Sequence, residues 1–262
     1  MKPITPEISV VLPCFNEQKT IHKAIESILD QSLRDFELII VDDGSSDETM
    51  VVVEKYRRLD SRIIVLSNEI NMGLPSSLNS AISLSNSTFI ARMDADDISH
   101  PSRFEKQYEF MLANPDVSVV GTGVRLIDAR DNTYISDCMM PELHEDIFKL
   151  RYLNRFNFHP TVMMRRLSVC EVGKYDLSLA RSRAEDLDLW LKLSREYRFH
   201  NLQEVLLDYS VNLSTLKPRY WLGGCNLRLK HMNINNELAT QAWRLVPYSL
   251  SYWKRMIFSI LN

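Results

Sequence analysis

Short apolar runs recur along the first half of the chain, separated by segments that carry an apolar residue at every third or fourth position. The runs are typical of buried strands, and the intervening periodicity is typical of amphipathic helices. The predicted strands are Ile8 to Pro13, Phe36 to Val41, Arg62 to Ser67 and Thr88 to Met93. Four such strand and helix units in succession predict an α/β fold with a mostly parallel sheet flanked by helices. Ligands of such sheets bind beyond the carboxyl ends of the strands.

The regular pattern weakens after the fourth unit. Several elements are still expected there: a helix from Pro101 towards Leu112, a strand at Val117 to Val120, a hairpin around Asp131-Asn132, a helix at Leu143 to Leu153, an extended segment at Thr161 to Met164, and an amphipathic helix at Leu187 to Leu193. We therefore predict one domain over 1–212, with a regular half at 1–120 and a less regular half at 121–212.

Composition narrows the class of protein. The chain has 262 residues, 45% of them hydrophobic and 25% charged, and its formal net charge of -3 does not indicate a nucleic-acid-binding protein. The four cysteines form no C-x-x-C pair, so neither a zinc site nor a disulfide framework is indicated. No signal peptide or apolar run of about 20 residues is present. The expected location is the cytoplasm.

The segment 213–262 differs from the rest of the chain. From Lys217 onward its basic residues face a single acid, Glu237, and several tryptophans and tyrosines lie among them. We expect a helical extension. It can rest on an anionic membrane surface, where each basic residue adds about 1 kcal/mol, or pack on the catalytic domain. We favour peripheral contact with the inner face of the cell membrane.

An acidic segment, Asp94-Ala-Asp-Asp97, follows the fourth predicted strand. Side chains alternate between the two faces of a strand, so Asp94 and Asp96 are expected to point into the same space. Carboxylate oxygens suit Mg²⁺ or Mn²⁺, which proteins often bind together with substrate phosphates. The alternative is an acidic loop that caps the next helix.

Two other acidic sites allow more than one interpretation. Asp42 and Asp43 follow the second strand, where Asp-Gly also favours a tight turn. Asp186 lies at the start of a predicted helix, whose dipole keeps a carboxylate ionised. Asp186 is therefore a candidate general base for a hydroxyl group. An ordinary helix-terminal residue with no chemical role is the alternative.

Taken together, these segments resemble the inverting glycosyltransferases of family 2, which have the GT-A fold. The resemblance covers about Ile8 to Tyr209 and is specific through the order and spacing of its motifs. The matching segments are Pro13-Cys-Phe-Asn-Glu17, Val41-Asp-Asp-Gly-Ser-Ser-Asp47, Asn71-Met-Gly73, Asp94-Ala-Asp-Asp97 and Ala184-Glu-Asp-Leu-Asp-Leu-Trp190.

The resemblance implies that 1–212 is a catalytic domain, with a nucleotide-sugar-binding half at 1–120 and an acceptor-binding half at 121–212. It also implies roles on the donor side of the site. Asp43, together with Asp42, would bind the nucleotide base, and Asp94 would contact the ribose. Asn71 belongs to the same nucleotide-sugar-binding group. Asp96 would be the direct ligand of Mn²⁺ or Mg²⁺.

Roles on the acceptor side follow in the same way. Asp186 would be the catalytic base of a single displacement, and Glu185 would help to position the acceptor. His159, which precedes Pro160, is a further acceptor-binding candidate, although a histidine in an apolar stretch is often structural.

One segment departs from the family pattern. Many members carry Tyr-Arg-x-His near the end of the catalytic domain, where the histidine can complete the metal and diphosphate site. This chain has Tyr209-Ser-Val-Asn212 instead. Asn212 offers an oxygen and no imidazole, so the transfer of this role is open.

The expected reaction moves a hexose from a UDP-sugar to a sugar carried on a lipid diphosphate such as undecaprenyl diphosphate. The specific expectation is galactose or glucose joined β-1,3 to N-acetylglucosamine in bacterial O-antigen synthesis. Two alternatives remain. One is a sugar-phosphate nucleotidyltransferase, although the Gly-rich loop of that class is missing after the first strand. The other is a non-catalytic nucleotide-sugar-binding protein.

Overall fold

The computed structural model describes residues 6–180, 184–212 and 231, and within them the chain builds one nine-stranded sheet. The first half of the chain supplies strands that lie in the order β3-β2-β1-β4, and all of these pairs are parallel. Their bounds are β1 (Ile8–Cys14), β2 (Phe36–Asp42), β3 (Ile63–Ser67) and β4 (Phe89–Arg92). The four predicted strands and their parallel arrangement are confirmed.

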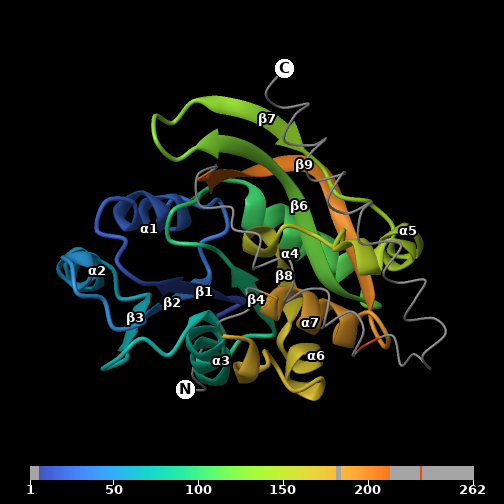
Figure 1. Ribbon diagram of the computed structural model, residues 1–262, viewed down its shortest axis with the longest axis horizontal. Helices are drawn as coiled ribbons and strands as arrows, with labels where there is room; N and C mark the ends of the chain where they lie inside the picture. Colours follow the sequence, from blue (N-terminus) through green and yellow to red (C-terminus); the bar gives the residue numbers. More distant parts are fainter. Residues whose placement is uncertain (1–5, 181–183, 213–230, 232–262) are drawn as a thin grey trace.

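The second half of the chain extends this sheet in the order β4-β8-β6-β9-β5. β8 runs antiparallel to both β4 and β6, whereas β6 and β9 are parallel. Figure 1 shows β6, β7 and β9 curving over the rest of the sheet. The added strands are β5 (Ile98–Ser99), β6 (Val117–Asp128), β7 (Tyr134–Cys138), β8 (Met163–Arg165) and β9 (Arg198–Val211).

Helices cover both faces of the sheet because neighbouring residues of the buried strands point in opposite directions. Val10 and Leu12 belong to the hydrophobic cluster of one face, and Val11 belongs to that of the other. The first face is covered by α1 (Ile21–Leu29), α2 (Thr49–Leu59) and α4 (Arg103–Ala113). The second is covered by α3 (Leu74–Leu84), α5 (His144–Lys149), α6 (Arg166–Glu171) and α7 (Glu185–Leu193).

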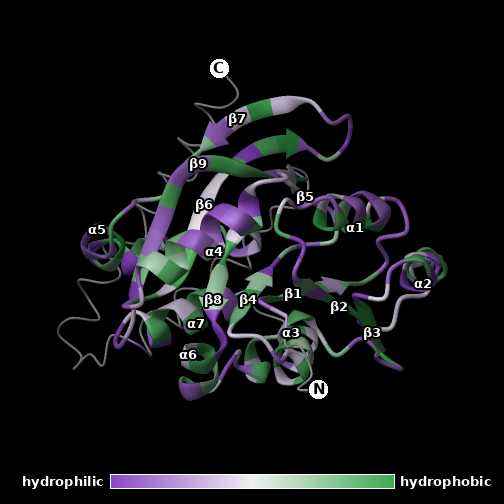
Figure 2. Ribbon diagram, turned by 180° about the vertical axis from the view of Figure 1, so that it is seen from behind, coloured by the Kyte–Doolittle hydropathy of each residue, from purple (hydrophilic) through white to green (hydrophobic). Residues whose placement is uncertain are grey.

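The helix α1 illustrates why these segments are helical. Ile21, Ala24, Ile25 and Ile28 are buried, and their spacing places them on one stripe of the helix. Figure 2 shows the resulting alternation of hydrophobic and hydrophilic residues along α1. The buried stripe, rather than intrinsic helix propensity, fixes such a short helix on the sheet.

Some elements differ from the expectations. The strand expected at Val117 to Val120 continues to Asp128 and then turns into β7, which confirms the hairpin around Asp131-Asn132. The helix expected at Leu143 to Leu153 divides into α5 and a short 3-10 turn. β9 was not predicted. Pairing with β6 on one side and β5 on the other holds this segment extended.

The C-terminal extension at 213–262 lies outside the described residues except for His231, so its helical nature and the domain boundary stay predictions. The imidazole Nε2 of His231 lies 2.8 Å from Oδ1 of Asp188 on α7. None of the helices in the described part of the chain has the length and apolar character that crossing a bilayer requires.

Candidate active site

The acidic loop after β4 brings three carboxylates together. One side-chain oxygen each from Asp94, Asp96 and Asp97 lies within 4.8 Å of the others. Oxygen donors at this spacing fit Mg²⁺ or Mn²⁺. The loop leaves the carboxyl end of β4, near the middle of the sheet, which is where α/β proteins bind ligands.

Asp96 and Asp97 of the acidic loop are partly or fully buried next to other carboxylates, and both have raised pKa values. Burial raises the pKa of Asp96 to about 7, and the negative charges of Asp94 and Glu17 add to the effect. Burial also raises the pKa of Asp97 well above its usual value, with Asp94 and Asp96 contributing. A bound divalent cation would offset this repulsion, so the charges as well as the donor atoms fit a metal site.

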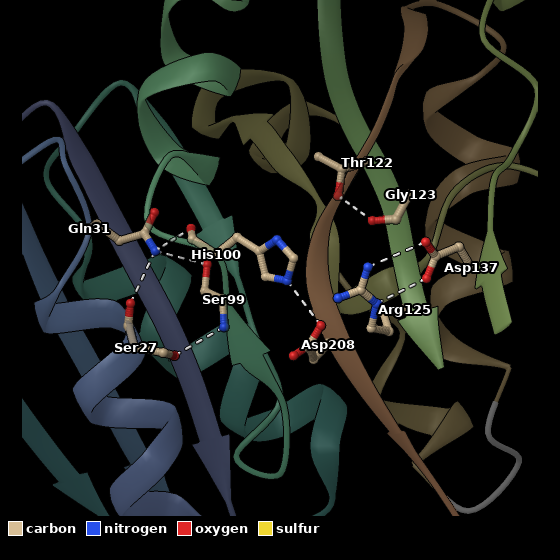
Figure 3. A network of polar contacts seen from close by, with 9 residues as sticks. All are labelled: Ser27, Gln31, Ser99, His100, Thr122, Gly123, Arg125, Asp137 and Asp208. Carbon is tan, nitrogen blue, oxygen red and sulfur yellow. Dashed lines mark hydrogen bonds and ion pairs between the residues drawn. The ribbon is translucent and has the colours of Figure 1, made fainter. Parts of the chain in front are cut away.

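The continuation of the loop is anchored to two other elements, as Figure 3 shows. The side chain of Gln31, just after α1, donates from Nε2 to Ser99 Oγ at 3.1 Å and to the His100 carbonyl at 2.7 Å. Ser27 Oγ accepts from the Ser99 N–H at 3.1 Å. His100 Nε2 lies 2.9 Å from Oδ1 of Asp208 on β9. The acidic loop is therefore held at its far end by α1 and β9.

A buried arginine lies beneath the acidic loop, and sequence reasoning missed it. The side chain of Arg92 is 2% exposed, and both of its terminal nitrogens donate to the Asp94 carboxylate, one of them to Oδ2 at 2.8 Å. Burial opposes its charge, but Asp94, Tyr175 and Asp97 raise the Arg92 pKa overall. A charged residue inside an otherwise apolar strand was the available signal, because such a residue needs a partner.

A second buried arginine, Arg103 of α4, supports the backbone beside the site. Its Nη1 donates to the Pro160 carbonyl at 2.9 Å, and its Nη2 donates to the Arg92 carbonyl at 3.2 Å. Burial lowers the Arg103 pKa to about 9, although the charge of Asp97 opposes this shift. Arg103 thus joins α4 to β4 and to the segment around His159.

The first turn of α7 brings two more carboxylates to the same place. Burial raises the pKa of Glu185 to about 7, with Asp186 as the second cause. Burial also raises the pKa of Asp186, while the Leu187 N–H, which donates to Asp186 Oδ1 at 2.7 Å, and the charge of Arg92 oppose the shift. The charge of Asp94 acts on both groups. The start of α7 therefore faces the acidic loop.

His159 lies within the aromatic packing next to these acids. Its Nε2 lies 2.8 Å from the Tyr175 hydroxyl, and its ring meets Trp190 edge to face at 5.7 Å between centroids. Burial, together with the charge of Arg92, lowers the His159 pKa well below its usual value. His159 is therefore a neutral imidazole held by Tyr175.

Asp43 organises the loop between β3 and α3. Its carboxylate accepts hydrogen bonds from Asn68 Nδ2 at 2.8 Å, from the Met72 N–H at 2.9 Å and from the Gly73 N–H at 2.8 Å. Gly73 has φ of 88°, a conformation that favours glycine. Asn71 is exposed on this loop, next to the two donating amides.

Asp42 and the loop after β1 complete this side of the site. Asp42 Oδ2 accepts from the Ser45 N–H at 3.2 Å. Asn16, at φ of 57°, accepts from the Ser46 N–H at 2.8 Å and so ties the loop after β1 to the loop after β2. β1 lies between β2 and β4, so the strand that leads to Asp42 and Asp43 lies about 10 Å from the strand that leads to the acidic loop.

Comparison with known proteins identifies the family. The family model described as "Glycosyl transferase family 2" matches residues 9–173. This chain belongs to glycosyltransferase family 2. It is a glycosyltransferase, as the resemblance of its motifs implied.

Two proteins with similar sequences are also named as glycosyltransferases. The O-antigen biosynthesis glycosyltransferase WbnJ of Escherichia coli is 36% identical over 242 residues, which cover 88% of this glycosyltransferase and 92% of WbnJ. The putative teichuronic acid biosynthesis glycosyltransferase TuaG of Bacillus subtilis is 30% identical over 257 residues, which cover 96% and 98% of the two chains.

Solved structures share the fold. S. aureus TarS 1-349 in complex with UDP-GlcNAc has a TM-score of 0.71 at 19% identity, over 90% of this chain and 70% of TarS. The mannosyltransferase PcManGT from Pyrobaculum calidifontis, in complex with GDP-Man and Mn²⁺, has a TM-score of 0.69 at 16% identity, over 95% and 73% of the two chains. The expected GT-A fold is confirmed.

Proposed function

We propose that this glycosyltransferase moves a hexose from UDP to a hydroxyl of a lipid-diphosphate-linked sugar and inverts the anomeric configuration. The observation that carries the proposal is the convergence of the acidic loop and the first turn of α7. Asp94 and Asp96 would serve the donor, and Asp186 would serve the acceptor. Arg92 lies close enough to influence all three carboxylates.

The donor nucleotide is assigned to the loops after β2 and β3. Asp43 accepts three hydrogen bonds, two at Oδ1 and one at Oδ2, and a carboxylate has about four lone-pair positions. One position on Oδ2 thus remains for an N–H of the base. Asp42 and Asn71 lie in the adjoining loops. The UDP-GlcNAc complex of TarS supports UDP as the nucleotide.

The Asp96 carboxylate is the proposed ligand for Mn²⁺ or Mg²⁺, and Asp94 and Asp97 lie beside it. A divalent cation there would neutralise charge on the leaving diphosphate. The Mn²⁺ in the PcManGT complex supports this assignment. Asn212 follows β9 directly and offers an amide oxygen where many family members have histidine.

Asp186 is the proposed base for the attacking hydroxyl. Burial raises its pKa, which strengthens the carboxylate as a proton acceptor, while Arg92 and the Leu187 N–H favour the ionised form. Glu185 would hold the acceptor beside it. His159 stays a weaker acceptor-binding proposal, because its Nε2 already contacts the Tyr175 hydroxyl.

The biological assignment draws on the relatives. WbnJ and TuaG are named for O-antigen and teichuronic acid biosynthesis, so a role in bacterial surface polysaccharide synthesis is proposed here. The specific proposal is galactose or glucose joined β-1,3 to N-acetylglucosamine on undecaprenyl diphosphate. The basic and aromatic segment 213–262 would hold the enzyme at the inner face of the cell membrane, where that lipid is found.

A donor screen tests the proposal. The full chain is incubated with Mn²⁺, a lipid-diphosphate N-acetylglucosamine and each of UDP-galactose, UDP-glucose, UDP-GlcNAc and GDP-mannose. Release of UDP together with a β-1,3-linked disaccharide product is expected with UDP-galactose or UDP-glucose. Transfer from GDP-mannose alone would refute the UDP assignment, and an α-linked product would refute inversion of an α-linked donor.

A further inference from the structure

Arg92 is the central buried cation of the site, and the reaction as proposed above uses it only to favour the ionised form of Asp186. It occupies the last position of β4, where its backbone N–H donates to the Val162 carbonyl at 2.9 Å. Its guanidinium contacts Asp94, and its charge acts on Asp96, Asp97, Glu185 and Asp186. A buried arginine needs such compensation, because burying an unpaired charge is strongly unfavourable.

The geometry of the contact is specific to arginine. The two terminal nitrogens of Arg92 face the two oxygens of Asp94, which is the bidentate arrangement of a guanidinium with a carboxylate. Arg92 is 2% exposed and the Asp94 side chain is 27% exposed. The arginine therefore holds Asp94 from the interior and leaves its outer edge open to the site.

This contact makes the three carboxylates of the acidic loop unequal as ligands for a metal ion. Both oxygens of Asp94 already bind a cation, so a metal ion gains less from Asp94 than from a carboxylate without such a partner. The outer lone pairs of Asp94 still accept hydrogen bonds from neutral hydroxyl groups. Asp97 is fully buried and accepts from the Ser210 N–H. Asp96 is left as the carboxylate best placed for the metal.

We propose that Arg92 is a positioning residue that reserves Asp94 for a hydroxyl group of the donor nucleotide sugar and directs the divalent cation to Asp96. The inference rests on the proposed function, since it assumes a nucleotide-sugar donor and a metal at this loop. It also gives a signature that a purely structural arginine would not produce. Loss of Arg92 should strengthen metal binding and weaken donor binding.

The test measures the two affinities separately by calorimetry on the full chain. In Arg92→Gln, removal of the positive charge frees Asp94 for the cation, so the Kd for Mn²⁺ without donor should fall roughly tenfold. The Kd for the UDP-sugar at saturating Mn²⁺ should rise roughly tenfold, because Asp94 is no longer held. A Kd for Mn²⁺ that is unchanged or higher in the folded variant would overturn the proposal.

Arg165 provides the matched control. It lies on β8, next to β4, and its guanidinium donates to the carbonyls of Val117 and Met111, both at 2.8 Å. Arg165→Gln should lower the free energy of unfolding and leave both affinities unchanged. The same rise in Mn²⁺ affinity in this variant would show a general effect of lost charge and would overturn the assignment to Arg92.

If Arg92→Gln does not fold, the same two affinities are measured in Arg92→Lys. Lysine keeps the charge and lacks the planar fork, so Mn²⁺ affinity should match the wild type while the donor Kd rises. An unchanged donor Kd would overturn the proposal. Failure of the proposed function is a separate result, because it would appear in the wild type as absence of both Mn²⁺ binding and transfer from every nucleotide sugar.

Discussion

Oδ1 of Asp97 accepts a hydrogen bond from the backbone N–H of Ser210 at 2.9 Å, which joins the acidic loop to the end of β9. The two residues are 113 positions apart in the chain. Asp97 is fully buried, and its Oδ2 has no hydrogen-bond partner among the described residues. β9, the last strand along the described chain, thus helps to fix the loop that carries Asp94 and Asp96.

Substitution of Asp97 should therefore affect stability through this contact. Asp97→Ala leaves the Ser210 N–H without its acceptor, and we expect the free energy of unfolding to fall by about 1–3 kcal/mol. Asp97→Asn keeps an acceptor of the same shape and should retain most of the stability. Urea unfolding at pH 7 measures both. Equal losses in the two variants would contradict a role for this hydrogen bond.

Substitution of Gln31 should lower both the stability of the protein and its apparent affinity for the donor. Gln31→Leu removes a fully buried amide that binds Ser99 and His100, so we expect a loss of about 2–3 kcal/mol and a higher KM for the donor. Gln203, which is exposed on β9, is the control, and Gln203→Leu should change neither value. A stability loss with an unchanged donor KM would show that the anchor does not reach the acidic loop.

Asp186→Asn should separate chemistry from binding. The amide cannot accept the proton of the attacking hydroxyl, so kcat should fall by roughly 10²–10⁴-fold while the Kd for the UDP-sugar stays near the wild-type value. Asp188→Asn is the control on the same helix. Asp188 contacts Lys192 and His231, so its loss should lower stability and largely spare kcat. Near-normal turnover of Asp186→Asn would require another base.

Glu185 should make stability depend on pH. Its pKa is raised to about 7 in the folded protein from 4.5, first by burial and then by Asp186. As the pH falls from 8 to 5, the folded state takes up a proton that the unfolded state does not yet bind, so the wild type gains stability. Glu185→Gln removes this dependence. It should therefore stabilise the protein more at pH 8 than at pH 5, by on the order of 2 kcal/mol.

Thermal unfolding of both proteins across this pH range provides the measurement. Glu145, in the exposed first turn of α5, is a useful comparison. Its own backbone N–H and Arg198 lower its pKa from 4.5, so its contribution to stability is present throughout this pH range and is lost only on further acidification. Glu145→Gln should thus leave the dependence of stability on pH unchanged between pH 8 and 5. A Glu185→Gln curve parallel to that of the wild type would contradict the raised pKa.

The elements with a local pattern could be predicted from the sequence alone. Apolar runs located β1 to β4, and helical periodicity located the helices between them, because burial on one or both faces leaves a repeat that a short window contains. The positions of Asp43, Asp96 and Asp186 at the ends of such elements followed as well. Strand ends and helix starts are visible in the order of residues along the chain.

Which residues come into contact depends on how distant segments of the chain pack together. β9 is a strand because β6 and β5 pair with it, and Arg92 is a buried partner of Asp94 because the folded chain leaves only 2% of its side chain exposed. The Asp97 to Ser210 contact depends on a chain closure that no local window contains. Burial and long-range pairing set the charges and hydrogen bonds of this site, and both arise only when distant segments pack together.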